Sequence, residues 1–393
     1  MVLLQSFIFM NEKAYEILSI LLLITHKKRE RERVYNMLQK QLTKYQQIEK
    51  VLKECQQPNY RMKQILHCIF KEKKTDFNEM SVLPKNLRDT LTTEIGTSLL
   101  TVEPLIEQKS QQVRKVLFNL SGDNRIETVN MTYQAGWESF CISSQCGCNL
   151  GCQFCATGKI GLRKNLTAEE ITDQVLYFLL KGHQIDSISF MGMGEPLANP
   201  HFFEALDIFM NPDMFQLSPR RLSVSTIGVI PKIKRLTAEY PQVHLTFSLH
   251  SPFDEERSQL MPINKSFPLL KVMDTLDEHI KVTSKKVYIA YILLPDVNDS
   301  LTHAVALADL LRSRYKKGKL YHVNLIRYNP TFDAPRTFKQ VDEKQVKLFY
   351  QTLISKGIKV TIRSQFGIEI DAACGQLYGN YEIKNKKTIQ VND

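Results

Sequence analysis

The sequence has no apolar run long enough to cross a membrane. The only long one, Ile17 to Ile24, is far shorter than the roughly 20 residues that a transmembrane helix needs. A charged string, His26 to Arg33, follows this run, and no small-residue cleavage site appears, so the order is wrong for a signal peptide. These absences predict a cytoplasmic protein that is neither exported nor anchored in a membrane.

Cysteine is also scarce, with 8 in 393 residues, and these are not spaced as in the disulfide framework of a secreted protein. At this frequency a ten-residue window should hold about 0.2 cysteines, whereas the window from Cys146 to Cys155 holds four. Two glycines in this window, Gly147 and Gly151, favour a loop over one face of a buried helix. The cluster therefore indicates chemistry rather than core packing.

Three of these cysteines, Cys148, Cys152 and Cys155, have the spacing C-x3-C-x2-C. Three thiolates can hold three irons of a [4Fe-4S] cluster and leave the fourth iron open to a small molecule. An alternative counts Cys146 as a fourth ligand of a closed tetrahedral zinc site, which would make the protein a zinc-stabilised RNA-binding module without catalysis. Zinc sites usually pair two short hooks across a longer insert, so the iron–sulfur interpretation is favoured and the zinc alternative remains open.

A second motif lies about forty residues downstream of the cysteines. Met191 to Pro196, with the sequence MGMGEP, follows the strand-like run Ser187 to Phe190. Together with Phe154 just before the last cysteine, this pattern resembles the radical S-adenosylmethionine superfamily. In that superfamily the corresponding strand end contacts the amino group of the cofactor's methionine, so the resemblance implies a pocket for S-adenosylmethionine here.

Stretches such as SFMGMGEPLANP, TFSLHSP and IDAACGQLYGNY narrow this resemblance. From Met37 to about Tyr381 the chain resembles one family of the superfamily, the Cfr and RlmN methyltransferases of an adenosine in 23S ribosomal RNA. The sequence around Cys146 and the segments ATGKIGL and HVNLIRYNP are closer to Cfr, which methylates C8. Pro196 instead agrees with RlmN, which methylates C2. The resemblance implies C8 methylation in the peptidyl transferase centre and resistance to ribosome-targeting antibiotics. C2 methylation of the same adenosine, and of transfer RNA as well, remains the alternative. The resemblance rests on the stretches FCISSQCGCNLGCQFCATGKIGLRKNLTAEEITDQVLYF, SFMGMGEPLANP, LSVSTIGVIP, TFSLHSP, VNLIRYNP and IDAACGQLYGNY.

The pattern of strands and helices from Glu138 onward predicts an α/β fold. Strand-like runs alternate with helix-length periodic segments, which predicts a parallel sheet with right-handed crossovers. This fits a partial (βα)6 barrel, which the resemblance also implies, and in parallel barrels the chemistry collects at the carboxyl ends of the strands. The predicted strands are Phe140–Ser143, Ser187–Met191, Leu222–Thr226, Leu245–Leu249, Val287–Ile292, His322–Leu325 and Val360–Ile362.

The remaining segments are expected to flank this barrel. Short helices between Gln46 and Glu94 resemble the family's small helical domain, which either helps to grip RNA or only caps the barrel. Alternating residues around the turn Ser121 to Asn124 predict a β-hairpin. We expect an N-terminal extension at 1–36 that is untranslated, disordered or loosely docked, a helical accessory domain at 37–97, a β-hairpin linker at 98–137, the barrel with a catalytic carboxyl-terminal segment at 138–381, and a polar tail at 382–393.

The family resemblance also implies the roles of individual residues. Cys374 matches the cysteine that carries the methyl group, Cys141 matches the cysteine that resolves the protein–RNA adduct through a disulfide, and Glu127 matches the general base. Without the resemblance, the local sequence predicts that Cys141 is a buried strand residue and that Glu127 is a solvated carboxylate. Cys148, Cys152 and Cys155 match the cluster ligands, and the matches to S-adenosylmethionine contacts are Gly194, Glu195, Ser225, Ser248, Leu249, His250 and Asn329.

The expected partners follow from charge and from the resemblance. A formal net charge of +11 suits a polyanion without proving one, and 23S ribosomal RNA is the implied substrate. The resemblance implies two S-adenosylmethionine molecules per turnover and a one-electron donor such as flavodoxin or ferredoxin, and we expect a monomer. A radical enzyme that inserts sulfur through an auxiliary cluster is disfavoured, because too few cysteines remain outside the triad.

Overall fold

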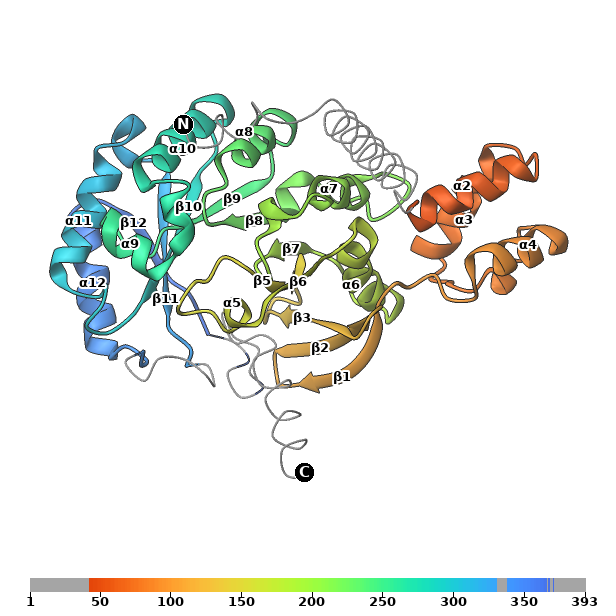
Figure 1. The fold of residues 1–393 in the computed structure, drawn as a ribbon, viewed down its shortest axis with the longest axis horizontal. Helices are drawn as coiled ribbons and strands as arrows, with labels where there is room; N and C mark the ends of the chain where they lie inside the picture. The colour runs from red at the N-terminus through yellow and green to blue at the C-terminus, as the bar shows by residue number, and fades with distance from the viewer. Residues whose placement is uncertain (1–41, 331–337, 366, 368–369, 371–393) are drawn as a thin grey trace, which may run out of the picture.

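The computed structural model describes residues 42–330, 338–365, 367 and 370. Its main feature is a ten-stranded sheet in the order β1-β2-β3-β4-β7-β8-β9-β10-β11-β12, whose strands are parallel from β4 to β12 (Figure 1). All seven strand-like runs predicted from Glu138 onward are found. The parallel strands are β4 (Glu138–Cys141), β7 (Ser187–Phe190), β8 (Leu222–Thr226), β9 (His244–Ser248), β10 (Val287–Leu293), β11 (Tyr321–Arg327) and β12 (Lys359–Ile362).

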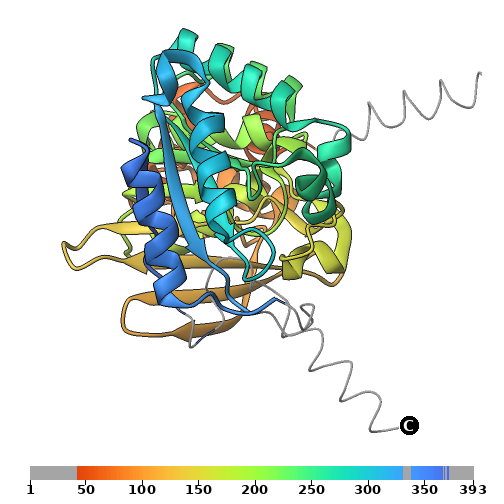
Figure 2. The same ribbon diagram turned by 90° about the vertical axis from the view of Figure 1, so that its left-hand side faces the viewer.

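Helices cover the outer face of the parallel strands, as right-handed crossovers require (Figure 1). In Figure 2, α11 and α12 lie on either side of β11. The two edge strands, β1 and β12, are not hydrogen-bonded to each other, so the barrel is open, and the predicted partial (βα)6 barrel is confirmed. The covering helices are α6 (Ala168–Leu180), α7 (Phe202–Met210), α8 (Ile230–Glu239), α10 (Leu269–Thr283), α11 (Leu301–Arg312) and α12 (Glu343–Ser355).

Alternation along the strands separates the core from the inner face of the barrel. On β9, Leu245 and Phe247 are fully buried in the core beneath the helices. Thr246 and Ser248, which point the opposite way, line a cavity on the inner face. The same alternation brings Ser225 of β8 into the cavity, whereas β10 contributes the apolar side chains of Ala290 and Ile292.

The predicted β-hairpin is present and extends the sheet. Strand β2 (Val113–Leu120) turns through residues 121–123 into β3 (Asn124–Thr132), and β1 (Glu103–Lys109) pairs with β2. Because β3 also pairs antiparallel with β4, its backbone groups on that side are satisfied by the barrel rather than by water. This segment is therefore continuous with the barrel sheet and is more than a connection.

Between residue 42 and the first strand, three α-helices pack on one another through Ile48, Ile65 and Leu91, which are fully buried. Phe70 reaches the barrel, where its ring centroid lies 4.9 Å from that of Phe215. The expected helical region is thus confirmed as α2 (Lys44–Glu54), α3 (Tyr60–Phe70) and α4 (Lys85–Ile95).

Some sequence predictions lie outside the described residues. These are the extension at 1–36 with its apolar run, the tail at 382–393, and Cys374. Within the ranges that the structure does describe, no helix combines the length and apolarity that crossing a membrane would require.

Candidate functional site

A cavity of about 1140 Å³, its open mouth included, lies at the carboxyl ends of the parallel strands. Each strand from β7 to β11 contributes a residue at or just beyond its end. This is where chemistry is expected in a parallel barrel, since all strand ends and the loops that follow them converge there. Examples are Glu195 after β7, Ser225 on β8, Ser248 on β9, Ile292 on β10 and Ile326 on β11.

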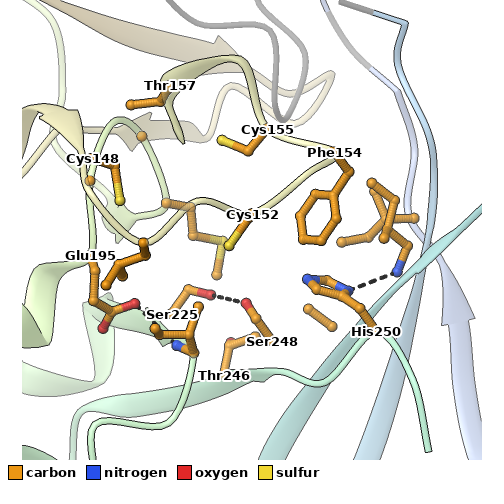
Figure 3. Close-up of a pocket in the computed structure, with 18 of the residues that line it drawn as sticks. Cys148, Cys152, Phe154, Cys155, Thr157, Glu195, Ser225, Thr246, Ser248 and His250 are labelled. Carbon is orange, nitrogen blue, oxygen red and sulfur yellow. Dashed lines mark hydrogen bonds between the residues drawn. The ribbon is translucent and has the colours of Figure 1, made fainter. Parts of the chain in front are cut away.

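The cysteine loop forms one wall of this cavity. Cys148 ends β5 (Gln145–Cys148), which pairs with β6 (Gly161–Asn165), and Cys155 is the N-cap of α5 (Ala156–Ile160). Gly147 permits this hairpin, because its φ is +74° and a Cβ there would lie 1.8 Å from the carbonyl oxygen of Gly161. Cys148, Cys152 and Cys155 all line the cavity (Figure 3).

The environment of these thiols suits a group larger than a single ion. Burial raises the pKa of Cys148 to about 11 and raises the pKa of Cys152 further, so their thiolates need positive charge to form. A zinc ion with Zn–S bonds of about 2.3 Å would hold its sulfur atoms close together. Within the described residues, no group of three or more His, Cys, Asp or Glu side chains is arranged around one ion. Three thiols that line one cavity without forming a single-ion site fit an iron–sulfur cluster better.

Cys146 does not belong to this group. It is fully buried, its Sγ lies 3.2 Å from the carbonyl oxygen of Arg125, and it does not line the cavity. Residues two apart on a regular β-strand, such as Cys146 and Cys148, would point to the same face. Here the register shifts between Cys146 and Gly147, and only Cys148 points into the cavity. The zinc alternative with Cys146 as a fourth ligand is therefore not supported by this geometry.

Glu195 is held rigidly in the wall opposite the cysteines (Figure 3). Its Oε1 accepts a hydrogen bond from the Leu197 N–H at 3.2 Å and its Oε2 one from the Ile227 N–H at 3.1 Å. Burial raises the pKa of Glu195 to about 7, although the Thr226 hydroxyl and the two N–H groups oppose this rise. A buried carboxylate at a pocket wall can accept a cationic group of a ligand.

Gly194, just before this carboxylate, lies close against the cysteine-bearing hairpin. Its φ is +92°, and a Cβ there would lie 2.4 Å from the Cβ of Gln145. The Oε1 of Gln145 accepts a hydrogen bond from the Glu195 N–H at 2.8 Å, and its Nε2 donates to Asn165 Oδ1 at 2.7 Å. Gln145, which the sequence analysis missed, therefore links the cysteine hairpin to the MGMGEP segment.

Polar groups on β8 and β9 complete the pocket. The hydroxyl oxygens of Ser225 and Ser248 are 3.4 Å apart on its floor. Burial lowers the pKa of His250 to about 3, so its ring is neutral. Its Nδ1 accepts a hydrogen bond from the Ile292 N–H at 3.0 Å, which leaves the ring hydrogen on Nε2 as a donor. The ring of Phe154 packs on His250 at a centroid distance of 4.8 Å (Figure 3).

Two predicted cofactor contacts do not line this cavity. The side chain of Leu249 is fully buried in the core, and its N–H donates to the Ala290 carbonyl oxygen at 3.1 Å. Asn329 is nearly buried, and its Oδ1 accepts a hydrogen bond from Gln365 Nε2 at 2.7 Å. In the described structure, a ligand in this cavity could contact Leu249 only through its backbone. Contact with the side chain of Asn329 would require Gln365 to rearrange.

The sheet register places Cys141 on the face that bears the cavity. Cys141 pairs directly with Ser189 of β7, and Met191, two residues beyond Ser189, lines the cavity. Glu127 lies on the same face of β3, two residues from Val129, the partner of Cys141. Glu127 is buried and its Oε1 lies 3.2 Å from Lys115 Nζ, so the solvated carboxylate expected without the resemblance is not found.

Two further buried polar residues were missed in the sequence analysis. Asn298 donates hydrogen bonds to the carbonyl oxygens of His250, at 2.7 Å, and Ile292, at 2.8 Å, and so holds the loop after β9. Arg257 binds the carbonyl oxygens of the same loop and of the β8 loop. Neither residue carries a sequence signal, because an exposed Asn in a loop or an exposed Arg in a helix has the same local pattern.

Comparison with known proteins agrees with this geometry. Residues 142–308 match the radical SAM superfamily, and residues 36–95 match the ribosomal RNA large subunit methyltransferase N-terminal domain. The chain is 65% identical over 346 residues to "Ribosomal RNA large subunit methyltransferase Cfr" of Bacillus velezensis, an alignment that covers 88% of this chain and 99% of that protein. It is also 65% identical to the protein of that name from Staphylococcus aureus, over 86% of this chain and 97% of that one.

A solved structure shares the architecture. The crystal structure of a radical SAM methyltransferase from Sphaerobacter thermophilus matches with a TM-score of 0.79 and 37% sequence identity, over 86% of this chain and 98% of that one. The relatives are matched over nearly their whole length, and the match includes the segments that build the cysteine loop and the cavity. The chain therefore belongs to the Cfr family of the radical SAM superfamily.

Proposed function

We propose that this protein is a cytoplasmic methyltransferase that modifies C8 of an adenosine in the peptidyl transferase centre of 23S ribosomal RNA, and so protects the ribosome from antibiotics that bind there. The observation that carries the proposal is one pocket in a Cfr-family chain that brings together three cysteines, a buried carboxylate and a neutral histidine. C8 is preferred to C2 because the relatives reported above are Cfr proteins.

In this proposal Cys148, Cys152 and Cys155 hold a [4Fe-4S] cluster. When bound, the cluster supplies one electron to S-adenosylmethionine, and flavodoxin or ferredoxin provides that electron. Glu195 lies where it can receive a cationic group, and the Nε2–H of His250 can donate to an acceptor on the ligand. The further contacts proposed for S-adenosylmethionine are Gly194, Ser225, Ser248, the backbone of Leu249, and Asn329.

The methyl group itself passes through the protein. We assign Cys374 as the residue that carries the methyl group. One S-adenosylmethionine methylates this cysteine, and a second is consumed when the carbon is transferred to the RNA. Cys141 resolves the protein–RNA adduct by forming a disulfide with Cys374, which is consistent with its place on the inner face below the cavity. Glu127 takes the ring proton, and its ion pair with Lys115 favours the charged carboxylate that a base requires. The enzyme acts as a monomer.

The cluster ligands are tested by paired substitutions in the same loop. Cys148→Ala should lose the cluster absorbance and RNA methylation together, because one of three ligands is removed. Cys146→Ala is the matched control, since that thiol lies outside the cavity, and it should keep both. Methylation that survives in Cys148→Ala would overturn the proposed mechanism.

The role of Cys141 has a distinct signature. Cys141→Ala should accumulate enzyme crosslinked to RNA, visible as a slowly migrating band on a denaturing gel, because the adduct forms but is not resolved. A Cys141→Ala enzyme that turns over normally without this band would remove Cys141 from the scheme. Mass spectrometry of nucleosides from the wild-type reaction separates an 8-methyl from a 2-methyl product and decides between the two target carbons.

A further inference from the structure

Arg257 is a charged residue of α9 (Asp254–Leu260) that no solvent reaches. Its guanidinium hydrogen-bonds to neutral oxygens on two loops. Nε donates to the Leu249 carbonyl oxygen at 3.1 Å, and Nη2 donates to those of Ile227, at 2.8 Å, and Ser248, at 3.2 Å. Nη1 donates to the side-chain oxygen of Asn264. One side chain thus joins the ends of β8 and β9, which carry Ser225, Ser248 and His250.

Within the described part of the chain, the charge of Arg257 has no direct counter-ion. All four acceptors are neutral, and among the residues that the structure describes no Asp or Glu forms an ion pair with it. Burial lowers the pKa of Arg257 to about 10, so the guanidinium stays charged at neutral pH. A fully buried charge without a partner is costly, and proteins that retain one usually compensate it with an opposite charge nearby.

The negatively charged groups that the charge of Arg257 can offset belong to the pocket. The helix that carries Arg257 contacts the cysteine loop directly, because the Gln153 N–H, next to Cys152, donates a hydrogen bond to the Leu260 carbonyl oxygen of α9 at 3.0 Å. The peptide of Ile227 also connects Arg257 to Glu195, since its N–H donates to the Glu195 carboxylate while its carbonyl accepts from Arg257. Arg257 therefore sits behind the pocket wall, outside the lining, where its field reaches the cysteine loop.

We propose that Arg257 is a positioning residue with two effects on this site: its charge offsets the negative charge of the thiolate-bound cluster and favours one-electron reduction, and its hydrogen bonds hold the β8 and β9 loops in the ligand-binding arrangement. The proposal rests on the proposed function, because it assumes that the cluster is present. The only redox step is the gain of one electron by the oxidised cluster from a one-electron reductant, and Arg257 forms and breaks no covalent bond. Net charge near a cluster is one of the factors that set its reduction potential.

Two substitutions separate the two effects. Arg257→Lys keeps the charge but loses most of the hydrogen bonds, so the midpoint potential should stay near that of the wild type while S-adenosylmethionine binds about tenfold more weakly. Arg257→Gln loses the charge, so its midpoint potential should shift to more negative values. The potential is measured by anaerobic titration followed by electron paramagnetic resonance, and the affinity by the spectral change on adding S-adenosylmethionine.

Controls keep the test decisive if Arg257→Gln fails to fold. Asp254 is an exposed carboxylate whose charge raises the pKa of Arg257, so Asp254→Asn should shift the potential the opposite way, to less negative values. Glu255→Gln, the next exposed carboxylate along the helix, should leave it unchanged.

Unchanged potentials in both Arg257→Gln and Asp254→Asn, or in Asp254→Asn alone where the first variant does not fold, would overturn the electrostatic effect. Wild-type affinity for S-adenosylmethionine in Arg257→Lys would overturn the bracing effect. A wild-type protein that binds no iron would instead refute the proposed function, so the two failures are distinguishable.

Discussion

A buried ion pair helps to attach the helical region to the barrel, and its contribution can be tested by removing one partner. Lys44 Nζ lies 2.5 Å from Asp173 Oδ1 on α6, and it also donates to the Leu99 carbonyl oxygen at 2.8 Å. The side chain of Lys44 is 6% exposed and that of Asp173 is fully buried. The other oxygen of Asp173 accepts hydrogen bonds from the N–H and the hydroxyl of Thr101.

Lys44→Met should destabilise the protein strongly. It leaves Asp173 buried with only the two Thr101 donors, and removal of one partner from a buried pair costs about 3–5 kcal/mol. The free energy of unfolding is measured by urea denaturation at neutral pH, followed by circular dichroism. Asp173→Asn added to Lys44→Met should cost less than the sum of the single changes, since the second substitution removes the unpaired charge.

An exposed pair in the same helix provides the control. Lys50 and Glu54 are 3.7 Å apart, and both side chains are 62% exposed. Lys50→Met should change the free energy of unfolding by no more than about 0.5 kcal/mol, because solvent screens the pair. If Lys44→Met cost no more than Lys50→Met, the ion pair would not be what fastens the helical region.

Two other perturbations follow from the site. Gly194→Ala should abolish S-adenosylmethionine binding in a calorimetric titration, because the new Cβ would overlap Gln145, whereas Gly136→Ala, also at positive φ but with nothing within 4 Å, should bind normally; equal binding by both would contradict this geometry. Burial lowers the pKa of His250 to about 3. Because the unfolded chain then binds the proton more readily, stability falls as the pH drops below about 6.5, by about 2 kcal/mol at about pH 5 for this group. The free energy of unfolding, measured by urea denaturation above about pH 6.5 and at about pH 5, should fall by about 2 kcal/mol less in His250→Gln than in the wild type. An identical fall in both proteins would refute the neutral state assigned to His250.

The strand order and the site location could be predicted from the sequence for a physical reason. The runs that form β7 to β10 are short and separated by helix-length segments, and such units favour a parallel sheet with right-handed crossovers. Parallel strands end at one edge, so residues that follow different strands, such as Glu195 and Ser248, must converge there. Cys148 and Cys152 could be identified because their spacing is local.

Contacts between distant segments could not be predicted in this way. The burial of Glu127 against Lys115 depends on the pairing of β2 with β3 and on how that hairpin continues into β4. The separation of Cys146 from the other cysteines depends on an irregular register between two short strands. Neither feature changes the local residue pattern, so the sequence alone could not place the side chains of Glu127 and Cys146.

The sequence by itself determined that this protein has a parallel α/β sheet with a cysteine loop and a glycine-rich strand end at one edge, because spacing and periodicity are properties of the local chain. Only the tertiary structure decided which thiols share the pocket, that His250 is neutral, and that Arg257 is buried with hydrogen bonds to neutral oxygens behind the cysteine loop. These features arise from desolvation and from contacts between residues far apart in the chain, and both exist only once the elements have packed together.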